Sequence, residues 1–312
     1  MKLGIVIPCY NEEAVLAETT QRVEALFNEM IKNREISDDS FVCFVDDGSR
    51  DKTWEIIEDI SNQNPHFKGI KLSRNFGHQN ALIAGLMQLK DSADALISMD
   101  ADLQDDIMVI REFIEKYKEG YEVVYGVRED RSKDSTFKRA TAEFFYKFQS
   151  FMGIESVSNH ADYRLLSQKA LNVLAKFKEI NLFIRGVVPL IGFRSCSVYY
   201  SRGERFAGES KYPLKKMILF ALDGIASFSI VPLRIITVIG FIIFLFSLFI
   251  IFWVLIEKYL LGTTIQGWSS VIISIYFMGS IQLMSMGIIG EYVGRIFQQS
   301  KGRPRYIIDK EI

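Results

Sequence analysis

The sequence predicts an α/β domain built on a mostly parallel sheet, followed by two membrane-spanning helices. Two observations support this prediction. In the first part of the chain, short apolar runs alternate with longer stretches whose apolar residues recur every three or four positions. Towards the end, two uncharged runs are long enough to cross about 30 Å of hydrocarbon at about 1.5 Å per residue.

Five short apolar runs predict the strands, at residues 3–8, 41–47, 67–73, 95–102 and 122–127. Four amphipathic stretches between them predict helices, at residues 13–32, 52–61, 78–90 and 106–117. Strands separated by helices imply right-handed crossovers and therefore a parallel sheet with helices on both faces. Because ligands bind beyond the carboxyl ends of the strands in such sheets, we expect the functional site at that edge.

The two uncharged runs are Ile235–Ile256, with 22 residues, and Thr263–Gly290, with 28. Buried core helices are the alternative, but they rarely run so long without a charge. Basic residues cluster on the outer flanks of the pair; they are Lys215, Lys216, Arg234, Arg295, Lys301, Arg303, Arg305 and Lys310. By the positive-inside rule, both termini are expected to be cytoplasmic. Residues 181–193 are apolar but too short to span, and could form either a membrane-facing patch or a core segment.

The predicted organisation has six parts in order. They are a cytosolic domain at 1–212, an amphipathic juxtamembrane segment at 213–230, a first membrane helix at 231–256, an external turn at 257–262, a second membrane helix at 263–290 and a basic cytoplasmic tail at 291–312. No secretory signal is expected, because the first apolar run is short and is followed at once by Asn11 and Glu12.

Composition excludes several classes of protein. The net charge of −1 argues against nucleic-acid binding, which usually needs a basic surface. Three cysteines without metal-ligand spacing indicate free thiols in a reducing compartment. The first strand is followed by Pro8-Cys9-Tyr10-Asn11-Glu12, so the chain has no glycine-rich phosphate loop there, and neither a dinucleotide fold nor a P-loop is supported.

The segment MDADLQDD, at residues 99–106, is the strongest local signal of chemistry. Asp100 and Asp102 follow an apolar run, and carboxylates two residues apart can converge on one point. Hard cations such as Mg²⁺ take oxygen ligands and keep positions open for phosphate. In the absence of a glycine-rich loop, such a cation could neutralise a bound diphosphate. The alternative is that the two acids simply keep a loop soluble.

Polar side chains follow each of the first four predicted strands. They are Tyr10-Asn11-Glu12, Asp46-Asp47-Gly48-Ser49, Ser73-Arg74-Asn75 and Asp100-Ala101-Asp102. In a parallel sheet these four endings can meet in one crevice. The second of them is also typical of a plain turn, since Asp and Gly favour turn positions.

Six motifs in order resemble the family 2 glycosyltransferases with a GT-A fold, in the polyprenyl-phosphate branch. They are VIPCYNEE, VDDGSRDKT, SRNFGHQNAL, MDADLQDD, DYRLLS and RFAGESKY. With the two C-terminal runs, the chain is similar to bactoprenol glucosyltransferases and dolichyl-phosphate mannose synthases over nearly its whole length.

The resemblance implies roles for particular residues. The donor nucleotide would be bound by Pro8, Tyr10, Glu12, Asp46, Asp47, Asp100 and Ala101, and Mg²⁺ or Mn²⁺ by Asp100, Asp102 and Gln104. The catalytic residues would be Asp102, Asp162 and Arg164, and the acceptor phosphate and diphosphate would meet Arg128, Arg139, Arg205, Ser210 and Lys211. Arg131 and Lys138 could also contact the acceptor phosphate, and for these two a solvated basic face is an equal alternative.

The implied reaction is the transfer of a hexose, with inversion, from a nucleotide sugar to undecaprenyl or another polyprenyl phosphate. Glucose and uridine diphosphate are favoured; N-acetylglucosamine, galactose and mannose stay open as alternative sugars. The second pKa of a phosphate monoester is about 6, so the acceptor phosphate is already an anionic nucleophile. His78, at the start of a predicted helix, is therefore not needed as a catalytic base. The implied setting is the bacterial inner membrane, where the lipid-linked monosaccharide would serve cell-envelope glycan modification; a homo-oligomer stays open.

Two other classes are weaker interpretations. A processive polysaccharide synthase would need a Gln-x-x-Arg-Trp signature, which the chain lacks. A transporter or flippase partner would carry an ionisable residue in its membrane helices to mark a substrate path, and neither uncharged run has one.

Overall fold

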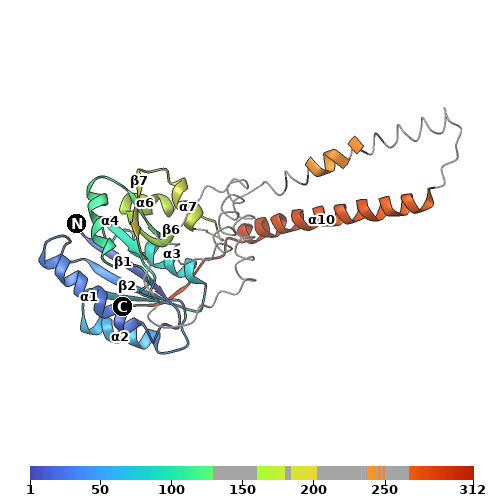
Figure 1. The fold of residues 1–312 in the computed structure, drawn as a ribbon. Coiled ribbons are helices and arrows are strands. Elements are labelled where there is room, and N and C mark those ends of the chain that lie inside the picture. The colour runs from blue at the N-terminus through green and yellow to red at the C-terminus, as the bar shows by residue number, and fades with distance from the viewer. Residues whose placement is uncertain are drawn as a thin grey trace. The chain divides into compact units, whose positions relative to one another are not determined.

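A computed structural model describes residues 1–128, 160–179, 184–201, parts of 233–249, and 267–312 (Figure 1). These residues belong to two compact units. An α/β unit holds the described residues up to Ser201 together with Arg303–Ile312, and a helical unit holds the described residues from 233 to Gly302.

The described part of the α/β unit contains an eight-stranded sheet in the order β7-β5-β6-β4-β1-β2-β3-β8. The strands are β1 (Leu3–Cys9), β2 (Phe41–Asp46), β3 (Phe67–Leu72), β4 (Ala95–Ser98), β5 (Val123–Arg128), β6 (His160–Ser167), β7 (Ser195–Tyr200) and β8 (Ile308–Glu311). Strands β1 to β4 are parallel, as are β5 and β7. Strand β6 runs antiparallel to β4 and β5, and β8 runs antiparallel to β3. The predicted α/β fold with a mostly parallel sheet is confirmed.

Helices cover both faces of this sheet (Figure 1). They are α1 (Leu16–Lys32), α2 (Thr53–Gln63), α3 (His78–Leu89), α4 (Val109–Lys118), α6 (Gln168–Leu174) and α7 (Ile184–Leu190). Successive strand side chains point to opposite faces. Ile5 and Phe44 therefore share one core with side chains from α1, α2 and α4, whereas Val6 and Val45 face α3, where Gly85 lets the helix lie close to them.

The five predicted strands correspond to β1 to β5, and the four predicted helices to α1 to α4. Within residues 181–193, Ile184–Leu190 form α7. Its Ile184, Val187 and Val188 are buried and belong to the core, whereas Leu190 is exposed. The core alternative therefore holds for these three buried side chains.

Residues 291–312, predicted as a basic cytoplasmic tail, contain regular secondary structure. Helix α10 (Trp268–Ser300) continues through the first part of this segment, and β8 then adds to the edge of the sheet. The backbone N–H and C=O of Ile312 both bond to Gly69, at 2.9 and 3.0 Å, and Ser73 N–H donates to the Ile307 carbonyl. An edge strand presents unpaired backbone groups that another segment can pair with, and the end of the chain pairs with those of β3.

Removal of residues 307–312 is expected to destabilise the α/β unit. Three backbone hydrogen bonds outside the β3–β8 ladder would be lost with the strand, together with the Gln88–Glu311 contact. At about 1 kcal/mol for each bond, we expect a loss of roughly 3 kcal/mol. Thermal unfolding followed by circular dichroism measures it, with Asp309→Ala, an exposed change within β8, as the control. Equal melting temperatures for the truncated and full chains would contradict this prediction.

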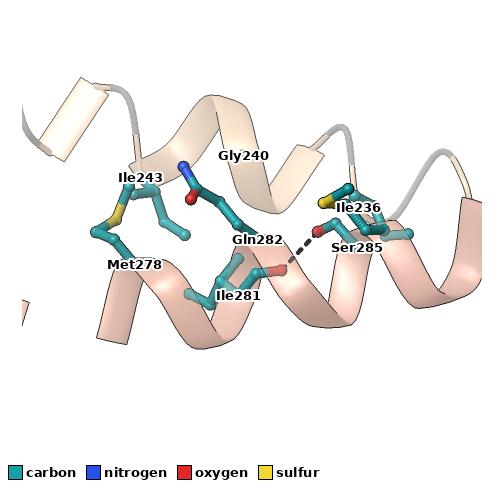
Figure 2. A pocket seen from close by; sticks show the side chains of 8 residues that line it. Ile236, Gly240, Ile243, Met278, Ile281, Gln282 and Ser285 are labelled. Carbon is teal, nitrogen blue, oxygen red and sulfur yellow. Dashed lines mark hydrogen bonds between the residues drawn. The ribbon is translucent and has the colours of Figure 1, made fainter. Parts of the chain in front are cut away.

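The helical unit contains α10 and helical residues between 233 and 249. Between them lies a cavity of about 520 Å³, and Figure 2 shows seven of its lining residues by name: Ile236, Gly240, Ile243, Met278, Ile281, Gln282 and Ser285. Ser285 Oγ donates to the Ile281 carbonyl at 2.8 Å. Most of the first predicted span lies outside the described residues. Among the residues that are described, no helix has the length and apolar character that a membrane crossing requires.

Candidate active site

One edge of the sheet gathers the polar residues that the sequence singles out. The parallel strands β1, β2 and β4 all end there. Strand β6 runs the opposite way, so its beginning lies at the same edge, with Arg164 paired to Ser98 at the end of β4. Arg128, the last residue of β5, pairs with Tyr200 of β7. The antiparallel strand therefore adds Asp162 and Arg164 to a site built on strand ends.

The loops after β1 and β2 are joined by hydrogen bonds. Asn11 N–H donates to Ser49 Oγ at 2.9 Å, and Glu12 N–H donates to Thr53 Oγ1 at 2.9 Å. Asn11 has a φ of 54°, in the left-handed region that Asn tolerates better than most residues. Pro8 is buried within β1, whereas Tyr10 is 40% exposed. Of these predicted donor ligands, Tyr10 is the side chain most open to a bound molecule.

The two carboxylates that end β2 are both buried. Asp46 accepts the N–H of Ser49, which matches the turn alternative. Asp47 accepts Phe76 N–H at 2.7 Å and Gly77 N–H at 2.9 Å, one on each oxygen. Burial raises the pKa of both carboxyls, and these hydrogen bonds oppose the rise. Asp47 therefore fixes the loop after β3, and a nucleoside contact by either residue stays a prediction.

Asp47→Ala is expected to destabilise the fold. The change leaves two backbone N–H groups, of Phe76 and Gly77, without their carboxylate acceptor. Two charge-assisted bonds predict a loss of about 2–4 kcal/mol in the free energy of unfolding. Chemical denaturation measures the loss, and Asp59→Ala on the exposed side of α2 is the matched control. If both variants unfold at the same denaturant concentration, Asp47 does not hold this loop.

The loop after β4 carries the Asp-Ala-Asp motif. The carbonyl of buried Ala101 accepts the Thr19 hydroxyl at 2.8 Å, and Asp102 Oδ1 accepts Gln104 N–H at 3.2 Å. Leu103, which lies between Asp102 and Gln104, has a φ of 55°, which is uncommon for a residue with a bulky side chain. The backbone is thus fixed on both sides of Asp102. Strained backbone of this kind is often found at ligand sites.

Asp100 lies among carboxylates and cationic side chains. Burial raises its pKa to about 6; His78 opposes the rise, and Asp105, Asp162 and Asp102 add to it. Two carboxylates on one loop, Asp100 and Asp102, suit a hard divalent cation. Among the described residues no group of three or more Asp, Glu, His or Cys side chains could hold a metal. A cation here would therefore need oxygen ligands from a substrate or water as well.

Asp162 is held by two arginines. Its Oδ1 accepts Arg164 Nη2 at 2.7 Å and Arg185 Nε at 3.1 Å, and its Oδ2 accepts Arg185 Nη2 at 3.0 Å. Burial would raise the pKa of Asp162, but Arg185 and then Arg164 outweigh it and hold the pKa well below its usual range. Asp162 is consequently an anion with low affinity for a proton. Arg164 itself is fully buried.

A second pair joins Asp105 to Arg128. Asp105 Oδ1 accepts the Tyr200 hydroxyl and Arg128 Nη2, the latter at 3.3 Å. Arg128 Nε also lies 3.4 Å from the Tyr200 hydroxyl. Asp105 is buried, and within the described part of the chain its Oδ2 has no hydrogen-bond partner. Arg128, predicted as a phosphate ligand, is therefore held in place by the buried carboxylate of Asp105.

His78 begins α3 and faces two of the carboxylates. Its Nε2 lies 3.5 Å from Asp100 Oδ1 and 3.8 Å from Asp162 Oδ2. The preceding Gly77 has a φ of 93°, a conformation that favours glycine. His78 therefore bridges the Asp100 loop and the Asp162 cluster. The sequence placed it at a helix start but gave no indication of these partners.

The structure brings together Asp100, Asp102, Asp162, Arg164 and Arg128 at one edge of the sheet. The other predicted phosphate ligands lie outside the described residues; they are Arg139, Arg205, Ser210 and Lys211, with Arg131 and Lys138. Sequence reasoning missed Asp105, Tyr200 and Arg185. Asp105 lies inside the MDADLQDD motif and could have been considered. Arg185 is 23 residues from its partner, within an apolar segment, so no local pattern marks it.

A family model described as "Glycosyl transferase family 2" matches residues 4–175. The uncharacterized glycosyltransferase YkoT of Bacillus subtilis is 51% identical over 310 residues, which is 99% of this chain and 92% of YkoT. The bactoprenol glucosyl transferase of Shigella phage SfV is 39% identical over 312 residues, 100% of this chain and 99% of that protein. A prophage bactoprenol glucosyl transferase homolog of Escherichia coli is 37% identical over 311 residues, 99% of each chain.

Proposed function

The chain belongs to glycosyl transferase family 2, and on that premise we propose that it transfers a hexose from a nucleotide sugar to a polyprenyl phosphate. The observation that carries the proposal is the full-length similarity to bactoprenol glucosyl transferases. Glucose from a uridine diphosphate donor is the favoured pair, and N-acetylglucosamine, galactose or mannose are the alternatives.

The proposed reaction is an in-line displacement at the anomeric carbon. An oxygen of the acceptor phosphate forms the new bond to that carbon, the bond to the donor diphosphate breaks, and the nucleoside diphosphate leaves with its electron pair. The configuration is inverted. The acceptor is an anion near neutral pH, since the second pKa of a phosphate monoester is about 6. This agrees with a site in which a buried carboxylate, Asp162, accepts hydrogen bonds from two arginines and is held as an anion.

A divalent cation, Mg²⁺ or Mn²⁺, fits the residues at the end of β4. Asp100 and Asp102 would supply carboxylate oxygens, and Gln104 lies on the same loop. Mg²⁺ commonly binds to one or two carboxylates and completes its shell with substrate phosphates and water. Bound there, the cation would neutralise charge on the departing diphosphate. The protein's part is to fix the loop, which it does through the Thr19–Ala101 and Gln104–Asp102 hydrogen bonds.

We further propose that the chain crosses a bacterial cell membrane twice, with the α/β unit and both termini in the cytoplasm. The support is threefold. The uncharged runs at 235–256 and 263–290 are long enough. Apolar side chains of α10 are exposed, among them Leu283 and Met286. Finally, β1 and β8 belong to one sheet, so the chain between them must cross an even number of times.

The test is an assay with purified protein in detergent. It combines polyprenyl phosphate, Mg²⁺ or Mn²⁺, and a panel of nucleotide sugars, and detects a lipid-linked monosaccharide by mass spectrometry. We expect product with one donor, and none when a chelator is added. Binding of a nucleotide sugar without product across the whole panel would overturn the enzymatic proposal and favour a non-catalytic partner of a transporter. Product that persists in excess chelator would overturn the metal proposal alone.

A further inference from the structure

Arg185 on α7 has the features of a substrate-binding residue, although no sequence motif marks it. Its helix is firmly seated: Ile184, Val187 and Val188 are buried, and Ile184 N–H lies 3.4 Å from Gln79 Oε1 at the start of α3. Within the first turn of α7 the Arg185 side chain is the one that stays partly open, at 37% exposed. A rigid helix therefore presents a guanidinium at the edge of the sheet where the candidate site lies.

The guanidinium is oriented by Asp162. Two parallel bonds, from Nε at 3.1 Å and Nη2 at 3.0 Å, fix its plane in the fork geometry that suits Arg–carboxylate pairs. Within the described part of the chain, Nη1 has no hydrogen-bond partner, so its two N–H groups remain for a ligand. Among the described residues, the single charge of Asp162 faces two arginines, Arg164 and Arg185. Arg164 is fully buried, so Arg185 is the arginine of this pair that a ligand can reach.

Arg128, at the end of β5, is a second arginine held by a buried carboxylate. It is partly exposed, at 28%, and is held by a carboxylate, Asp105, that is almost fully buried. Arg128 and Arg185 repel each other electrostatically, and Asp100 attracts Arg185. Two partly exposed guanidiniums, each held by a buried carboxylate at this edge of the sheet, are suited to binding a multivalent anion.

We propose that Arg185, oriented by Asp162, binds a phosphate group of a substrate, and that Arg128 contacts the same anion or its neighbour. The inference rests on the proposed function, because that function supplies the anions. The chemistry is the same for the acceptor monophosphate and for the donor diphosphate. Asp162 then serves as a positioning residue that holds a phosphate-binding arginine, and takes no proton in the reaction.

The experiment compares Arg185→Ala, Arg185→Lys and wild type in two measurements. Calorimetry gives the Kd of uridine diphosphate without any turnover, and initial rates give KM for polyprenyl phosphate and kcat. If Arg185 holds the donor diphosphate, we expect Arg185→Ala to raise the Kd roughly 10- to 100-fold; if it holds the acceptor, we expect the same rise in the acceptor KM with the Kd unchanged. Arg185→Lys keeps the charge without the fork and should recover part of the loss.

Arg111→Ala is the matched control, because Arg111 is also held by carboxylates, Glu29 and Glu35, but lies on α4 away from the strand ends. It should leave both constants unchanged. A purely structural Arg185 would lower the melting temperature of Arg185→Ala while Kd and KM stay at wild-type values, and that result would overturn the proposal. If Arg185→Ala does not fold, Arg185→Lys provides the test. An unchanged Kd and KM in Arg185→Lys would overturn the proposal, and a rise in either constant would support it. Absence of turnover in wild type would count against the proposed function, and the calorimetric arm would still test Arg185.

Discussion

Asp102→Ala is expected to reduce turnover by on the order of 10³-fold, the loss typical of removing one preorganised group that stabilises developing charge. Asp102 is the second carboxylate of the loop that ends β4, and its position is fixed by Gln104 N–H and by the left-handed Leu103. Without it, a cation would retain only Asp100 from this pair. We therefore expect divalent-cation-dependent binding of the nucleotide to be lost as well, as measured by calorimetry with and without Mg²⁺.

The fold should survive this change, because Asp102 is partly exposed and contributes little to the core. Asp106→Ala is the matched control: it removes an exposed carboxylate from the same loop, one that accepts Met108 N–H at the start of α4. We expect nearly wild-type turnover from it and a small loss of stability. Wild-type turnover in Asp102→Ala, or an equal loss in both variants, would remove Asp102 from the cation site.

The sequence predicted those elements whose identity is set by local pattern. Strands β1 to β4 are short apolar runs with polar residues at their ends, and α1 to α4 show helical spacing of apolar residues. The spacing of apolar residues and the polar residues that end each run are therefore enough to predict these elements. Strand β6 lacks such a pattern because Arg164, a fully buried charge, lies in its middle. Its position depends on pairing with β4 and β5 and on the ion pair with Asp162, neither of which is local.

The same reason limited the prediction of the site. Asp100 and Asp102 follow β4 and Arg128 ends β5, so all three could be placed at one edge of the sheet from topology alone. The partners that orient them come from elsewhere in the chain: Tyr200 is 95 residues from Asp105, and Arg185 is 23 residues from Asp162. Strand β8 is a charged tetrapeptide, and it becomes a strand because β3 has an edge to pair. Such pairings are properties of the folded chain and leave no signature in sequence spacing.

Asp162→Asn is expected to lower the free energy of unfolding by on the order of 3 kcal/mol near neutral pH, since breaking a buried ion pair leaves a charge uncompensated. Arg164 is fully buried and donates a hydrogen bond of 2.7 Å to this carboxylate. The amide keeps the shape and one acceptor oxygen but removes the negative charge. Chemical denaturation in detergent measures the loss, and Glu122→Gln, which removes a charge paired with exposed Lys169, is the control with little expected effect.

The pH dependence of this loss has a definite sign. The arginines hold the folded-state pKa of Asp162 well below the value of about 3.9 for an unfolded Asp, against the opposing effect of burial. The stabilisation is therefore fully present above that unfolded value and is lost as the pH falls below it. The difference between wild type and Asp162→Asn should be constant from neutral pH to about 5 and should shrink steadily below about 4. A difference that grows on acidification would mean that Asp162 is protonated in the folded protein, in which case it could not anchor Arg185.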